Sequence, residues 1–108
     1  MSDEHLHRAE SAVKTAGNIS ADKKVKLLGL LSRLKSAIGD ISQTHAEDAQ
    51  SVARLAEASA REATHKRPNQ LEKTLRELKQ SVDKFEASHP NLVIAVNEFA
   101  TILAEMGI

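Results

Sequence analysis

Hydrophobic residues recur at intervals of three and four along almost the whole chain, which is the period of one face of an α-helix. Turn and capping residues divide this pattern into four segments, at residues 3–16, 21–65, 70–88 and 90–106. No stretch alternates apolar and polar residues as a half-buried strand would. The pattern therefore predicts one all-α domain over residues 1–108, an elongated helical bundle with a long central helix and a C-terminal helical hairpin.

The first helix, at 3–16, is predicted to begin after Ser2, because serine is a preferred N-cap residue. Gly17 and Asn18 follow it, and both tolerate the left-handed conformation that closes many helices. Ser20 is the predicted N-cap of the next helix.

The second segment, 21–65, is predicted to form one long helix, bent or broken near residues 39–44. Thr44 and Glu47 form a capping pattern that could restart a helix at that point. The apolar seam nevertheless continues in register across it, which favours a single helix. The second half of the seam is rich in alanine and is expected to contact a partner helix closely, since small residues let helix backbones approach.

Two further helices are predicted to form the C-terminal hairpin. Pro68 should end the preceding helix because the residue before a proline resists the helical conformation. Pro90 suits the first position of the last helix, with Ser88 or His89 as its cap. The helix between these prolines carries a heptad-like seam of Leu71, Leu75, Leu78, Val82 and Phe85.

The C-terminal third of the chain resembles a known family. It contains Leu75-Arg76-Glu77-Leu78, then Phe85-Glu86-Ala87-Ser88-His89-Pro90, and it ends in Ala104-Glu105-Met106-Gly107-Ile108. A leucine-rich helix, a Phe-Glu-x-x-His-Pro turn and a final Met-Gly-Ile are features of the short proteins grouped as domain of unknown function 4404. The resemblance is looser from His5 to Ile38. Residues 39–67 match nothing in the family and look like an insert.

This resemblance implies a bacterial, helical and non-enzymatic protein, and it transfers no functional residue. The residues themselves agree, since the chain has no nucleophile–base arrangement, no glycine-rich phosphate loop and no His-Glu-x-x-His motif. With only two aromatic residues, it is poorly supplied for a selective small-molecule pocket or for stacking on bases. We therefore expect no enzymatic activity, no cofactor, no small-molecule substrate and no nucleic acid partner.

Composition further limits the partners, the metal sites and the cellular location that we expect. The 15 basic and 15 acidic residues balance, so the chain has no overall attraction to anionic membranes. The absence of cysteine excludes disulfides and thiolate metal sites. The first ten residues are polar, and no apolar run approaches the roughly 18 residues of a membrane span, so we expect a cytoplasmic location.

Two Glu-x-x-His motifs are the sharpest candidates for chemistry. They are Glu62 with His65 and Glu86 with His89, and di-iron bundles use such pairs on facing helices. Both motifs lie at predicted helix ends beside prolines, where core metal ligands are not expected. We therefore interpret them as solvent-exposed or turn-packing residues, and a metal site remains the alternative.

Basic residues and one histidine on the second segment give further alternatives. His45 lies on the apolar seam, which is typical of a core or interface histidine, although its titration near neutrality could make packing pH-sensitive. The leucines at 27–34 are surrounded by basic residues, a pattern that can bind a membrane surface or act as an adaptor helix. Most such faces are simply solvated. The basic residues are Lys23, Lys24, Lys26, Arg33 and Lys35.

Association with another polypeptide is the function that the sequence favours. Sixteen of the apolar residues are alanine, so the core of a small monomer would be marginal, and association is one remedy. We expect a homodimer, or a complex with a different protein, formed through the seam of the second segment. The expected interface residues are Leu31, Leu34, Ile38, Ile41, Ala49, Val52, Ala56 and Ala63.

Overall fold

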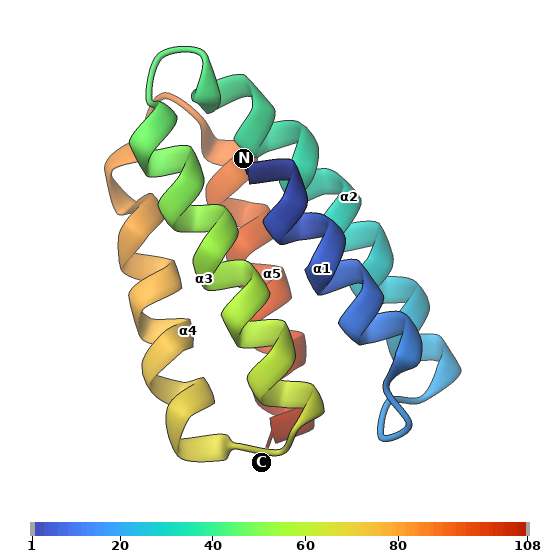
Figure 1. The fold of residues 1–108 in the computed structure, drawn as a ribbon. Coiled ribbons are helices and arrows are strands. Elements are labelled where there is room, and N and C mark those ends of the chain that lie inside the picture. The colour runs from blue at the N-terminus through green and yellow to red at the C-terminus, as the bar shows by residue number, and fades with distance from the viewer. Residues whose placement is uncertain (1, 108) are drawn as a thin grey trace.

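The computed structural model describes residues 2–107, and every regular element within them is helical (Figure 1). The all-α prediction is confirmed. The side chain of Ser2 lies outside the described part of the structure, so the N-cap predicted at Ser2 lies outside it too. The elements, in chain order, are α1 (Ser2–Thr15), α2 (Ala21–Ser42), α3 (Ala46–Thr64), α4 (Pro68–Val82), the 3-10 turn η1 (Asp83–Phe85) and α5 (Pro90–Gly107).

The helices form two layers, with α1, α3 and α4 in front of α2 and α5 in the view of Figure 1. α3 packs against all four of the other α-helices, and α2 packs against α5 in the opposite direction. Because each helix folds back on the one before it, the molecule measures 37 × 22 × 21 Å. It is not built on one long central helix.

The prediction of a single helix over residues 21–65 was wrong. α2 ends at Ser42 and α3 begins at Ala46, so the chain reverses over three residues. The Ile41 carbonyl accepts hydrogen bonds from the N–H groups of Thr44 at 3.2 Å and of His45 at 2.6 Å. The apolar seam crosses this break in register because both helices turn their apolar faces toward the same core.

The seam expected to bind a second copy lies inside a single chain. α1 and α4 flank α3, and α1 packs on its alanine-rich side, so the close approach predicted for small residues occurs within the monomer. No surface remains there for another molecule. The buried seam residues, each at most 1% exposed, are Leu31, Leu34, Ile38, Ile41, Ala49, Val52, Ala56 and Ala63.

Helix ends follow the sequence signals only in part. The Ser20 hydroxyl accepts a hydrogen bond from the Lys23 N–H at 3.3 Å, so the cap predicted for α2 is present. Gly17 does not take a left-handed conformation. The capping pattern at Thr44 does not form, because His45 occupies the N-cap position of α3 without a side-chain capping hydrogen bond.

The C-terminal hairpin is present, with α4 packed against α5. α5 begins at Pro90 as predicted, and α4 has Pro68 in its first turn. α4 is shorter than the predicted 70–88, because it ends at Val82 and tightens into the 3-10 turn η1. The His89 N–H then donates to the Phe85 carbonyl at 2.7 Å and closes the turn before α5.

α3 ends in a Schellman motif that lacks the usual glycine. The Arg67 N–H donates to the Glu62 carbonyl at 3.0 Å and the Lys66 N–H donates to the Ala63 carbonyl at 3.4 Å. Lys66 takes the left-handed conformation that this motif requires, with φ of 52°. A side chain makes that conformation costly, so the turn carries local strain.

Replacing Lys66 with glycine should therefore stabilise the protein. We expect Lys66→Gly to raise the free energy of unfolding by about 0.5–1 kcal/mol, because glycine enters the left-handed region without a Cβ clash. Chemical denaturation measures the change. Arg67→Gly is the matched control and should lower stability, since φ at Arg67 is −115° and gains nothing from glycine. Equal effects of the two substitutions would contradict this account.

Enlarging a buried alanine of α3 should destabilise the fold. Ala56 is fully buried, so Ala56→Leu forces α3 away from its neighbours and should cost about 1–3 kcal/mol of unfolding free energy. Ala46→Leu, on the exposed first turn of the same helix, is the control and should change stability little. Thermal unfolding of both variants tests the prediction, and an unchanged Ala56→Leu variant would refute it.

Candidate protein-docking face

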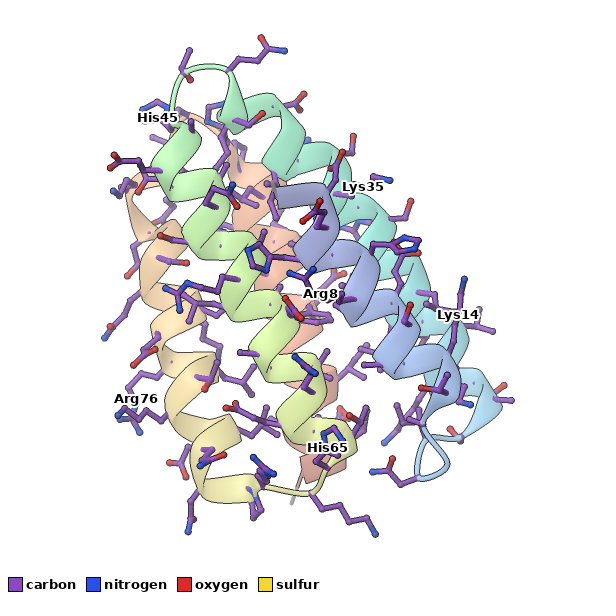
Figure 2. The ribbon with its side chains drawn as sticks, in the orientation of Figure 1. Arg8, Lys14, Lys35, His45, His65 and Arg76 are labelled. Carbon is purple, nitrogen blue, oxygen red and sulfur yellow. The ribbon has the colours of Figure 1, made fainter. Side chains whose placement is uncertain are left out.

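A buried carboxylate joins α1 to α3. The Glu57 side chain is only 8% exposed, and its Oε1 lies 2.7 Å from His5 Nδ1. Its Oε2 accepts a hydrogen bond from Arg8 Nε at 2.9 Å and a longer one from Arg61 at 3.4 Å. In Figure 2, Arg8 extends from α1 toward α3. This cluster fixes the register of α1 on the alanine-rich side of α3.

The charge on Glu57 is stabilised by its partners. Burial alone would raise the pKa of Glu57, but the hydrogen bonds and charges of Arg8 and His5 outweigh burial and hold that pKa below its ordinary value. The same hydrogen bond raises the pKa of Arg8. Both carboxylate oxygens are occupied by side chains of the chain itself, so the cluster acts as a structural clamp. Sequence reasoning missed it, although a glutamate among buried alanines of an amphipathic helix is a usable signal.

The two Glu-x-x-His motifs do not come together. His65 follows the C-terminus of α3, whereas His89 lies near its N-terminus, where both it and His45 contact Phe85. Figure 2 shows His45 and His65 at opposite ends of α3, whose 19 residues span about 28 Å. The paired-motif metal site is therefore wrong for a single chain. Within residues 2–107, no group of three or more potential metal ligands is found.

Each motif histidine has a local contact instead. His65 Nδ1 donates to the Arg61 carbonyl at 2.8 Å. The His89 ring meets Phe85 edge-on, with ring centroids 5.7 Å apart. His45, expected to be a core or interface histidine, is exposed because the chain breaks there; its ring and that of Phe85 meet edge-to-face, with centroids 5.2 Å apart.

The basic residues of α2 surround leucines that face the core. Leu27, Leu31 and Leu34 are fully buried, so the apolar stripe that a membrane surface would need is already in the core. Lys24 reaches toward α1 and donates to the Lys14 carbonyl at 3.1 Å. Over the described part of the chain, no helix combines the length and the apolar character of a membrane span.

A groove runs between α2 and α5 on the side that faces away from α3. It has a volume of about 590 Å³ and is lined mainly by apolar atoms. Its lining residues are Val25, Lys26, Gly29, Leu30 and Arg33 from α2, and Asn97, Glu98, Thr101 and Ile102 from α5. We call these residues, together with Ile94 and Glu105, the α2–α5 face.

The α2–α5 face exposes large apolar side chains. Val25 is 72% exposed and Ile94 is 48% exposed, and they stand out among the described residues because the other large apolar side chains are at least partly buried. Ile94 lies four residues before Glu98 and seven before Thr101, so it shares their side of α5. Gly29 lies between Val25 and Arg33 on α2, and a Cβ there would meet nothing within 4 Å.

One ion pair crosses the groove. Arg33 of α2 donates to Glu98 Oε2 of α5 at 2.8 Å, and both side chains are about half exposed. Exposed pairs of this kind contribute little to stability. The pair instead shows which positions along the two antiparallel helices lie opposite each other. We call such opposite positions one level.

The chain was compared with known proteins. The family model described as "Domain of unknown function (DUF4404)" matches residues 27–108, about three quarters of the chain. The chain belongs to this family. No curated protein and no solved structure matches the DUF4404 chain.

The match changes one expectation from the sequence. The segment 39–67, interpreted as an insert, lies within the matched region of this DUF4404 protein. It forms the end of α2 and the whole of the central helix α3, so it supplies core that the other helices need. α1 precedes the match, as do Val25 and Lys26 of the α2–α5 face, whereas the rest of that face lies within it.

The Glu57 clamp predicts how stability depends on pH. Because the pKa of Glu57 is lower in the folded chain than its ordinary value of 4.5, its contribution is complete above that value and is lost as the pH falls through the folded-state pKa. Glu57→Gln should lower the unfolding free energy at pH 7 by about 1–3 kcal/mol and flatten its fall in acid. Denaturation between pH 7 and pH 3 measures both effects.

Glu72→Gln serves as the control for the Glu57 variant. Glu72 is exposed and pairs with Arg76, one turn away at 3.5 Å, so its loss should change stability by no more than a few tenths of a kcal/mol. If the two glutamine variants had the same pH profile, the clamp would have no part in stability.

Proposed function

We propose that this protein is a non-enzymatic interaction module that binds another polypeptide through the α2–α5 face. The observation that carries the proposal is the exposure of Val25 and Ile94 beside an apolar groove. Burying apolar surface contributes roughly 25 cal/mol per Å², so side chains this exposed gain free energy when a partner covers them.

The shape and chemistry of the groove suit a helix from the partner. Grooves between two helices commonly accept the apolar face of a third helix. Gly29 leaves open space in the middle of the groove, so a partner backbone or side chain can approach α2 closely there. The charged groups that cross the groove, Arg33 and Glu98, already neutralise each other, so apolar contact would dominate binding.

This proposal keeps the association expected from the sequence and moves it to another surface. The seam residues of α2 and α3 are buried within one chain and are not free for a partner. The α2–α5 face lies outside that seam. It becomes a continuous surface only because α2 and α5 are neighbours in the fold.

Site-specific photo-crosslinking tests the proposal. A photoreactive phenylalanine derivative placed at position 25 in the native host should give a discrete protein adduct. The same group at the exposed position 54 on α3, in the other layer, is the control and should give none. Adding Ile94→Glu to the position-25 chain should abolish the adduct, because a charge then opposes burial of the face.

The crosslinking results distinguish docking at the α2–α5 face from no docking there. A defined adduct that requires position 25 and an apolar residue at 94 supports docking at the α2–α5 face. No adduct at position 25 above the control at position 54 would overturn the proposal.

A further inference from the structure

We propose that the polypeptide that docks on the α2–α5 face is a second copy of this chain, arranged so that α2 of each copy lies over α5 of the other. This inference rests on the proposed function and names its partner. The two-fold axis runs parallel to the helices, so residues at one level of the groove meet residues at the same level in the partner.

The levels follow from the ion pair across the groove. Arg33 and Glu98 are in contact, and α2 and α5 run in opposite directions. Lys26 lies seven residues before Arg33, and Glu105 lies seven residues after Glu98. Both steps are two helical turns toward the same end of the bundle, so Lys26 and Glu105 share one level.

The α2–α5 face is self-complementary in charge. On its α2 edge the groove carries the basic residues Lys26 and Arg33, and on its α5 edge the face carries the acids Glu98 and Glu105. Under the proposed axis, Lys26 of each copy meets Glu105 of the other, and the Arg33–Glu98 pairs of the two copies lie at the same level with opposite charges facing each other. The alternative pairing of α2 with α2 would place like charges together, which is unfavourable.

The acids of α2 do not upset this arrangement. Asp22 lies one turn before Lys26, at a level beyond the end of α5, and Asp40 lies near the level of Asn91 at the start of α5. Neither shares a level with Glu98 or Glu105.

The apolar part of the face is complementary in shape. Gly29 lies four residues before Arg33, and Ile102 lies four residues after Glu98, so these two also share a level. A Cβ at Gly29 would meet nothing within 4 Å in the monomer. In the dimer, Ile102 of each copy would enter the space over Gly29 of the other, and the exposed Val25 and Ile94 would be covered near the two ends.

Charge exchange at one level tests the arrangement. Lys26 and Glu105 are both exposed, so their substitution should leave the fold intact, which circular dichroism checks. Sedimentation equilibrium of the wild-type chain should show reversible association from 11.8 kDa to twice that mass. Lys26→Glu alone and Glu105→Lys alone should each weaken association at least tenfold, because each places like charges together twice in the symmetric dimer.

The double variant Lys26→Glu/Glu105→Lys should regain association close to that of the wild type. It restores opposite charges where α2 meets α5 of the other copy. If α2 instead packed antiparallel on α2 of the other copy, Lys26→Glu alone would strengthen association by facing Arg33, so weakening by that single variant separates the two arrangements. A double variant no tighter than the single variants would overturn the arrangement.

The experiments distinguish failure of the second-copy proposal from failure of the docking-face proposal. A wild-type chain that stays at 11.8 kDa up to millimolar concentration overturns the second copy. The crosslink at position 25 then tests the docking face independently of self-association. An adduct with a different protein keeps the docking face and rejects self-association, whereas an adduct of twice the chain mass supports both.

Discussion

The close packing that alanine allows around α3 is the constraint on which the rest of this structure depends. α3 contacts every other α-helix, and nine of its 19 residues are buried, six of them small. Larger side chains on its seams would push α1 and α4 outward and open the core. The two-layer arrangement therefore exists because α3 is narrow enough for four helices to reach it.

Small side chains fit together well but bury little apolar area, so α3 needs additional fixing. The Glu57 clamp provides it, since one carboxylate receives contacts from His5 and Arg8 on α1 and from Arg61 on α3 itself. Burying a charge is costly unless it is paired, and these partners supply that pairing. α1, which precedes the family match, is thus held in place by a polar contact as well as by packing.

The same packing determines what remains on the surface. Most leucines of α2, and Leu92, Val96, Phe99 and Leu103 of α5, are buried in the core, which leaves the outer sides of these two helices beside each other. These outer sides carry Val25, Gly29 and Ile94, which contribute nothing to the core. An exposed valine, a glycine with open space around it and an exposed isoleucine on one face are features of an interface, and they connect the fold to the proposed function.

The sequence by itself determined that the chain is helical, several of the helix ends and most of the buried apolar positions, because helical period and capping are local properties. It predicted the α4–α5 hairpin from Pro68 and Pro90, and the burial of every residue of the expected seam. Only the tertiary structure decided that the chain breaks at residues 43–45, that α1 covers the alanine seam, and that α2 lies beside α5. An apolar seam that continues in register through a turn gives the same sequence pattern whether its two halves form one helix or fold back on each other. The pattern is also the same whether the partner that covers the seam belongs to the same chain or to another. Spatial neighbours decide that, and one sequence does not specify them.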